Sequence, residues 1–529
     1  MITIKNILKT GVLAVLMATA TSCIDDLDRT PAYDVTSTSV YADAANYKPV
    51  LAKLYAVMAV SGQQGPAGKP DISGIDEGTS NYIRLLWTLQ QLPTDETVIA
   101  WNDQTIQDFH TMRWTSADGF IAGMYSRIFY LVTACNEFIR ETTDDKLASR
   151  NITGQAATDA RTYRAEARFL RALAYSHAID LFGSVPFVTE TDAPGSFLPS
   201  QISRADLFAY VENELKAVEI ELPAPRTSEY GRADRAAAWS LLAKLYLNAQ
   251  VYTGTGRYTD AVTYAGRVIQ ASAYSLAPNY QSLFLADNNN SPEIILPVAF
   301  DGLRTQTYGG MTFLIHAQVG GQMQASQFGI NSGWAGLRTT KALVNLFPDA
   351  TGAADKRALF FTQGQNLEIN DLTAFTDGYA VTKYRNVTAA GQAGSDPSGN
   401  YPDTDFPLFR LADVYLTYAE AVLRGGTGGD AATALTYVNA LRTRAGATAV
   451  TTAGLTLDFL LAERGRELYW EGTRRTDLIR YGRFTTGTYL WPWKGGIQNG
   501  RSVEDFRNLY PIPAADLVAN PNLKQNTGY

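Results

Sequence analysis

ADRAAAWSLLAKLYLNAQV at residues 233–251 and YTDAVTYAGRVIQAS at residues 258–272 are neighbouring stretches with one pattern. In each, apolar residues recur every three to four positions, which is the spacing of one face of a helix. Small alanines alternate with large leucine and tyrosine side chains along that face, so two such helices can approach closely. The glycine-containing residues 254–256 lie between the stretches and predict a turn. The pattern therefore predicts a helix-turn-helix pair.

The same arrangement recurs in two other parts of the chain. Residues 411–424 and 430–444 form a second candidate pair, joined by five residues of which four are glycine. Residues 116–141 and 159–181 form a third. Such pairs resemble tetratricopeptide repeats, in which small residues let paired helices pack closely. Because the pairs are degenerate and dispersed, we expect an all-α fold with a tetratricopeptide-like scaffold and not a regular solenoid.

Two long regions, roughly residues 61–110 and 273–405, lack this helical periodicity. Both are rich in glycine, asparagine, proline, threonine and aromatic residues. Loops held by a rigid scaffold commonly carry binding residues. We therefore expect long irregular binding loops here, in which an exposed aromatic ring would offer a flat stacking surface to a ligand.

The N-terminus has the features of a bacterial lipoprotein signal. Lys5 and Lys9 precede a short apolar run, and small residues then lead to Cys23. The run is too short to cross a bilayer as a permanent helix, so residues 1–22 are interpreted as a signal peptide. The alternative is ordinary cleavage without a lipid. We predict lipidation of Cys23, followed by an acidic tether over residues 23–40.

Composition argues against several classes of protein. The formal net charge of −7 leaves no basic face for nucleic acid, so no nucleic-acid partner is expected. The chain has three histidines and one cysteine besides Cys23, namely Cys135, which lies in an apolar helical stretch and is interpreted as a buried structural thiol. Neither His-Glu-x-x-His nor Gly-x-Ser-x-Gly occurs. We therefore expect that the protein is not an enzyme and that it has neither a cofactor nor a metal site.

Three further stretches carry a family resemblance when taken in order. They are EARFLRALAYSHAIDLFGSVP at residues 166–186, RGRELYWEGTRRTDLIRYG at residues 464–482, and the tail from LYPIP at residues 509–513 to Tyr529. Behind a lipoprotein-like start, this order resembles the SusD/RagB family of outer-membrane nutrient-binding lipoproteins. The resemblance covers almost the whole mature chain. It implies an N-terminal helical part over residues 41–280 and a C-terminal part with binding loops over residues 281–529, packed as one globular unit.

Three glutamates in the second of these stretches need a separate interpretation. Glu463, Glu467 and Glu471 follow each other at four-residue spacing, along one stripe of a helix and amid several arginines. A glycosidase requires one carboxyl group that stays protonated in an apolar setting. Carboxylates surrounded by guanidinium groups have a lowered pKa instead. We therefore interpret these glutamates as scaffold ion pairs and not as catalytic acids.

The candidate binding residues come from the two irregular regions. In the resembled family, starch-type glycans lie on an arc of aromatic side chains with polar groups beside it. In this chain the matching loops offer Trp101, Trp334, Tyr308, Arg84, Asn81 and Asn102. For each aromatic residue the alternative is simple packing within its own loop.

The resemblance implies a binding protein of the cell outer membrane that faces the exterior. It would capture an oligosaccharide or polysaccharide and deliver it to a SusC-like, TonB-dependent transporter. Two rival functions remain: a tetratricopeptide scaffold that binds a protein or peptide, and a glycoside hydrolase. The first would show a helical groove without an exposed aromatic arc. The second would need a carboxylate pair across a cleft.

Overall fold

Helices dominate the structure, a computed structural model that describes residues 36–66, 68–192, 195 and 197–529. The chain divides into two units, one ending at Tyr47 and one running from Lys48 to Tyr529. The predicted signal peptide, Cys23 and most of the tether lie outside the described residues. Among the described helices, none has the length and apolarity required to cross a bilayer.

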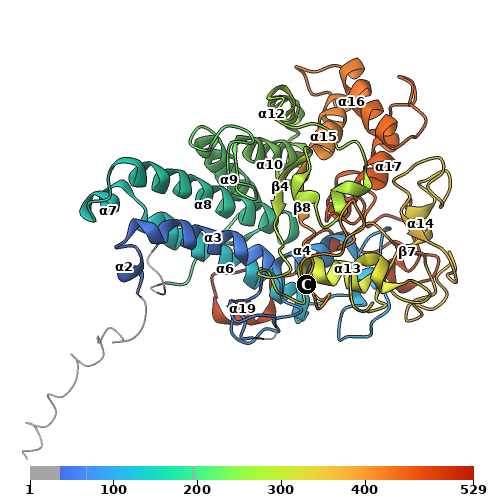
Figure 1. Ribbon diagram of the computed structural model, residues 1–529, viewed down its shortest axis with the longest axis horizontal. Helices are drawn as coiled ribbons and strands as arrows, with labels where there is room; N and C mark the ends of the chain where they lie inside the picture. Colours follow the sequence, from blue (N-terminus) through green and yellow to red (C-terminus); the bar gives the residue numbers. More distant parts are fainter. Residues whose placement is uncertain (1–35, 67, 193–194, 196) are drawn as a thin grey trace, which may run out of the picture. The chain divides into compact units, whose positions relative to one another are not determined.

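The elements are bounded as follows. The α-helices are α2 (Ser37–Val40), α3 (Tyr47–Ala59), α4 (Tyr82–Gln91), α5 (Asp108–Thr111), α6 (Gly119–Glu141), α7 (Asp144–Ser149), α8 (Gly154–Leu181), α9 (Arg204–Val218), α10 (Arg235–Leu247), α11 (Ala249–Thr253), α12 (Tyr258–Gln270), α13 (Gly310–Ala317), α14 (Lys341–Val344), α15 (Leu411–Leu423), α16 (Ala431–Arg444), α17 (Leu457–Leu468), α18 (Arg474–Arg480) and α19 (Ala514–Ala519) (Figure 1). The 3-10 helices are η1 (Ala44–Asn46), η2 (Gln281–Phe284), η3 (Asn288–Asn290), η4 (Ala325–Phe328), η5 (Lys494–Gly496) and η6 (Asp505–Asn508). The strands are β1 (Val98–Ile99), β2 (Val185–Pro186), β3 (Gln201–Ile202), β4 (Ile294–Val298), β5 (Leu337–Arg338), β6 (Phe360–Phe361), β7 (Ala380–Val381) and β8 (Phe406–Arg410).

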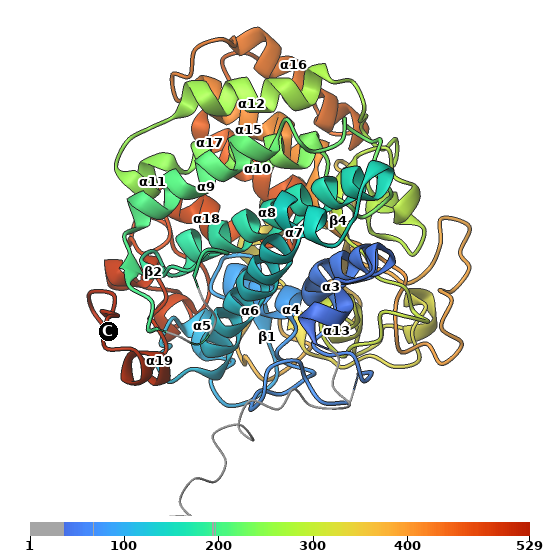
Figure 2. The same ribbon diagram turned by 90° about the vertical axis from the view of Figure 1, so that its left-hand side faces the viewer.

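All three predicted helix pairs are present and packed together. Helix α10 packs on α12, α15 on α16, and α6 on α8. Contacts of α8 with α9, α9 with α10, and α12 with α15 join these pairs into one stack, which Figure 2 shows from the side. Ala238 and Ala261 are fully buried, as expected of small residues at close helix contacts. The all-α, tetratricopeptide-like scaffold is therefore confirmed.

The predicted end of α8 is also found. Gly183 follows the helix with a φ of 75°, a left-handed conformation that glycine adopts without strain. Its N–H donates to the Ala178 carbonyl at 3.0 Å, which satisfies one of the last carbonyl groups of the helix. Cys135, on the adjacent α6, is fully buried, and burial raises the pKa of its thiol to about 12. The burial predicted for this thiol is confirmed.

One prediction about the irregular regions is wrong, because each contains a buried helix. Helix α4 lies in residues 61–110 and has all ten of its residues buried. Helix α13 lies in residues 273–405 and is likewise buried throughout. Helix α13 is largely apolar, so its sequence lacks the polar face that marks an amphipathic helix. Helix α4 does carry polar residues along one face, Arg84, Thr88 and Gln91, but these are buried as well. The loops around these two helices remain irregular, as predicted.

Four short antiparallel sheets, each of two strands, complete the described part of the chain. The sheet of β1 and β5 matters most for function because it joins the two irregular regions. Val98 pairs with Arg338 and Ile99 with Leu337. Ala100 N–H then donates to the Gly336 carbonyl at 2.8 Å. Residues more than two hundred positions apart are thereby held side by side.

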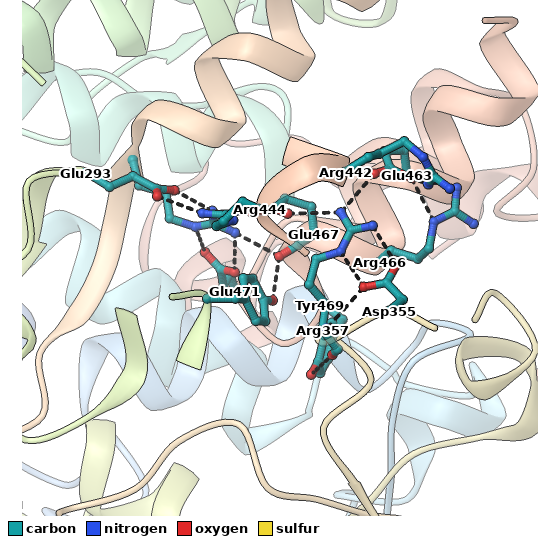
Figure 3. A network of polar contacts seen from close by, with 12 residues as sticks. Glu293, Asp355, Arg357, Arg442, Arg444, Glu463, Arg466, Glu467, Tyr469 and Glu471 are labelled. Atoms are coloured by element: carbon teal, nitrogen blue, oxygen red, sulfur yellow. Dashed lines mark hydrogen bonds and ion pairs between the residues drawn. The ribbon is translucent and has the colours of Figure 1, made fainter. Parts of the chain in front are cut away.

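The three glutamates of the C-terminal motif form the centre of a buried ion network (Figure 3). Arg357 contacts Glu463 at 2.8 Å and Glu467 at 3.0 Å. Arg410 contacts Glu467 at 2.7 Å and Glu471 at 2.6 Å. Further members of the network are Glu293, Asp355, Lys383, Arg442, Arg444 and Arg466.

The charges of this network keep two of the glutamates, Glu463 and Glu467, ionised. Burial alone would raise the pKa of Glu467, but the positive charges of Arg444, Arg410 and Arg357 outweigh it and hold that pKa below its usual range. The pKa of Glu463 is lowered in the same way, chiefly by Arg357 against the effect of burial. A general acid needs the opposite shift. The interpretation of these glutamates as scaffold ion pairs is therefore confirmed.

Candidate functional site

The β1–β5 sheet places the two predicted tryptophans next to each other. The indole N–H of Trp101 donates to the main-chain carbonyl of Trp334 at 3.0 Å. Their ring centroids are 6.3 Å apart, and the ring planes are inclined at 44°. Both residues are half-buried, neither fully covered nor fully exposed. The two indoles form a bent aromatic surface, which we call the platform.

Two side chains of helix α13 pack against the indoles of the platform. The ring of Phe313 lies 5.9 Å from that of Trp101, edge to face. The imidazole of His316 is stacked on Trp334 at 4.7 Å, with an interplanar angle of 27°. Sequence reasoning missed both residues because they belong to the unrecognised helix. Their spacing of three positions, which puts them on one helical face, is the signal that could have found them.

Gly336 lies directly against the face of Trp101. A Cβ atom at this position would be 2.6 Å from Cε2 of the indole, although the φ of Gly336 is not in the left-handed region. Glycine is therefore required here because a Cβ would collide with the indole, and not because the backbone angles demand it. Its carbonyl accepts from Ala100, which fixes the start of the Trp101 loop.

Replacing Gly336 with alanine should displace the Trp101 ring and weaken ligand binding about fivefold to 150-fold, since overpacking at such a contact costs about 1–3 kcal/mol. Affinity of the purified variant for the ligand of the platform measures this effect. Gly119→Ala is the matched control, because a Cβ there meets no atom within 4 Å. Unchanged affinity in Gly336→Ala would mean that Trp101 takes no part in binding.

Arg84 connects the platform to the third predicted aromatic residue. Its guanidinium carbon lies 4.4 Å from the centroid of Phe313 and 5.9 Å from that of Trp101. The same group donates to the Gly78 and Tyr308 carbonyls, at 3.1 and 3.4 Å. Burial lowers the pKa of Arg84 to about 10, and nearby Asp76 and Asp103 oppose that shift. The guanidinium thus remains charged at neutral pH.

Tyr308 extends the site beyond the two indoles. Its side chain is 37% exposed, and its ring lies 5.9 Å from that of Tyr401, which is buried. Burial raises the pKa of Tyr401, and the hydrogen bond with the Tyr308 hydroxyl acts in the same direction. Tyr401 is therefore a neutral hydroxyl at neutral pH, able to donate and to accept a hydrogen bond. Asn102, beside Trp101, is exposed.

The prediction for Asn81 needs a correction. Its side chain is fully buried and caps helix α4, accepting from the Arg84 N–H at 3.1 Å. The amide nitrogen donates to the Ala59 carbonyl at 2.7 Å. Both polar ends are occupied, because an asparagine before a buried helix satisfies its first N–H groups. Asn81 therefore holds α4 and Arg84 in place, away from any ligand surface.

The assembled groups suit a ligand with flat apolar faces and a polar rim. The platform supplies aromatic surface, and Tyr308 and Asn102 supply hydroxyl and amide groups nearby. The Arg84 guanidinium, also near, is buried and packs against Phe313. Within the described ranges, no three histidine, cysteine, aspartate or glutamate side chains gather as metal ligands. A separate cavity of about 100 Å³ lies among the scaffold helices, lined by Trp87, His177 and Lys244 among others.

Comparison with known proteins identifies the family. Residues 359–529 match the model described as the SusD family. The starch-binding protein SusD of Bacteroides thetaiotaomicron is 38% identical to this chain, over 99% of either protein. The chain belongs to the SusD family. The resemblance inferred from the sequence motifs is thus confirmed.

Other members of the SusD family are more distant. A SusD-like protein of Bacteroides ovatus is 27% identical, over 71% of this chain and 68% of its own length. The solved structure of surface glycan-binding protein A of Bacteroides thetaiotaomicron, in complex with laminarihexaose, has a TM-score of 0.70. It covers 91% of this chain and 99% of its own at 20% identity, so it shows the shared fold. SusD, which is similar to this chain over its full length, is named as a starch-binding protein, which confirms the prediction that this SusD-family chain is not an enzyme.

Proposed function

We propose that this protein binds a starch-type α-glucan on the platform of Trp101 and Trp334. The observation that carries the proposal is the pair of partly exposed indoles, inclined at 44° and flanked by Tyr308 and Arg84. The starch-binding SusD protein, similar over nearly its full length, supports the class of ligand. Trp334, Tyr308, Asn102 and Arg84 are the proposed contacts beside Trp101.

The geometry of the platform favours a chain that bends. Each sugar ring presents an apolar C–H face that stacks on an indole, while its hydroxyl groups point to the rim. Two sugar rings lying flat on planes inclined at 44° must themselves be inclined. An α-linked glucan turns between successive residues, whereas a β-1,4-linked chain forms a straight ribbon. The platform should therefore prefer starch-type chains to cellulose-type chains.

Affinity electrophoresis in gels that contain single polysaccharides tests this preference. Starch, amylopectin and pullulan should retard the mature protein, and hydroxyethyl cellulose should not. A parallel assay for reducing ends should detect no hydrolysis, which separates binding from glycosidase activity. Retardation by none of the glucans, combined with tight binding of a peptide, would favour the tetratricopeptide-scaffold alternative.

We further propose that the protein is held on the outer membrane by lipid on Cys23 and faces the exterior. There it would deliver its glycan to a SusC-like, TonB-dependent transporter. The proposal rests on the signal-like N-terminus and on membership of the SusD family. Acidic residues follow the cysteine, as in surface-exported lipoproteins of the resembled family.

Cys23→Ala should release the protein from membranes or leave an unprocessed precursor, because acyl chains on this cysteine are the proposed anchor. Membrane fractionation and labelling with radioactive palmitate measure the effect. Cys135→Ala is the control, since that thiol is buried in α6 and should not be acylated. A mature Cys23→Ala protein that still sediments with the outer membrane would rule out the lipid anchor.

A further inference from the structure

His316 occupies an unusual position beneath the platform. Its side chain is 1% exposed, and its ring is stacked on Trp334 at 4.7 Å. Nδ1 lies 2.7 Å from the carbonyl oxygen of Ser332, and Nε2 lies 2.9 Å from that of Asn400. The main-chain carbonyl of His316 also accepts from the N–H of Trp334, at 2.8 Å. One residue thus contacts both the ring and the backbone of Trp334.

The two carbonyl groups belong to different loops of the site. Ser332 lies two residues before Trp334, and Asn400 lies one residue before Tyr401, the ring partner of Tyr308. Asn331 reinforces the connection, because its amide donates to Oδ1 of Asn400 at 2.7 Å. The imidazole therefore spans the gap between the loop that carries Trp334 and the loop that supports Tyr308.

Both ring nitrogens face acceptors, which limits what could replace the histidine. A neutral imidazole donates through one nitrogen only, and the charged ring donates through both. Burial lowers the pKa of His316, while the carbonyl groups of Asn400 and Ser332 act in the opposite direction. In either form the flat ring combines a stacking face with polar edges at opposite ends. No other side chain of this size combines an aromatic face with polar atoms at opposite edges of the ring.

We propose that His316 is a positioning residue for the glycan platform, which fixes the Trp334 indole and ties it to the loop behind Tyr308. It does so without touching the ligand, since it lies buried under Trp334. This inference rests on the proposed function, because its effect on affinity is exerted through the platform.

Two substitutions separate the contributions of His316. His316→Phe keeps a stacking ring and loses both polar contacts, whereas His316→Gln keeps a donor and loses the stack. Each should lower affinity for maltoheptaose about fivefold to twentyfold, as expected when part of the contact of one anchoring aromatic residue is lost. His177→Phe is the matched control, because His177 also bonds to and packs on an aromatic residue, Tyr82, but within the scaffold.

The decisive comparison repeats His316→Phe and His316→Gln in a Trp334→Ala background. If His316 acts mainly through Trp334, each substitution should reduce the residual affinity clearly less than it reduces the affinity of the wild type. An equal loss in both backgrounds would overturn the proposal, as would wild-type affinity in the single variants. Thermal melting identifies a variant that fails to fold, and the remaining variant then decides.

A measurement without ligand keeps this inference separate from the proposed function. Near-ultraviolet circular dichroism reports the packing of tryptophan rings. His316→Phe should change the spectrum of the wild type and leave that of Trp334→Ala unchanged. If the wild type binds no glucan, the proposed function fails, but this spectral test still supports or contradicts the positioning role. A spectral change of equal size in both backgrounds would contradict it.

Discussion

Replacing Arg410 with methionine should destabilise the fold by about 3–5 kcal/mol, the cost of leaving buried charges without their partner. Arg410 is 1% exposed and contacts Glu293, Glu467 and Glu471 at 2.9, 2.7 and 2.6 Å. It also donates to the main-chain carbonyl of Glu467 at 2.8 Å. Methionine fills similar space but satisfies none of these acceptors. The three carboxylates would remain buried with fewer positive neighbours.

Chemical denaturation followed by circular dichroism measures this loss of stability. Arg161→Met is the control, because Arg161 forms an ion pair with Asp144 in which both side chains are more than half exposed. Exposed pairs contribute only about 0–1 kcal/mol. An equal free energy of unfolding in the two variants would show that the network of Figure 3 does not stabilise the fold.

Replacing Trp334 or Trp101 with alanine should cost about 1–3 kcal/mol of glycan binding, which is roughly a tenfold to hundredfold loss of affinity. Each indole is half-buried and lies in a loop, so its loss should affect the fold less than its loss affects binding. The two losses should not simply add, because the two rings lie against each other, with centroids 6.3 Å apart.

Trp114 provides the control for these tryptophan variants. It is 1% exposed and packs on Phe109 and Tyr510, away from the platform residues. Trp114→Ala should cost about 3–5 kcal/mol of stability, as for other buried aromatic residues, while the folded fraction keeps its affinity. Melting temperature and calorimetric affinity are measured together. Platform variants that melt as early as this control, or bind like the wild type, would show that the two indoles are packing residues.

Local patterns predicted the helical scaffold well. Alternating small and large residues at helical spacing identified the pairs α10–α12 and α15–α16, because that pattern serves close packing along one face. The stripe of Glu463, Glu467 and Glu471 could likewise be interpreted from its arginine neighbours. Its partners from distant parts of the chain, such as Glu293 and Arg357, could not be predicted, because tertiary packing brings them to the stripe.

The candidate site was predictable only in part, because its assembly also depends on tertiary packing. The lack of helical periodicity around Trp101 and Trp334 indicates that both lie in loops. Their contact, however, depends on the short β1–β5 sheet. Strands of two residues carry too little pattern to recognise in a sequence. Asn81 was assigned a ligand role although it directly precedes helix α4, where a capping role is the simpler interpretation. His316 and Phe313 were missed together with helix α13.

Isothermal titration of the mature protein with maltoheptaose tests the central claim most directly. We predict a saturable heat of binding for the wild type. The heat should be greatly weakened in a Trp101→Ala/Trp334→Ala double variant that still melts cooperatively, and no new reducing ends should appear. Absence of binding to any α-glucan, or equal binding by the double variant, would contradict the assignment of the platform as the glycan site.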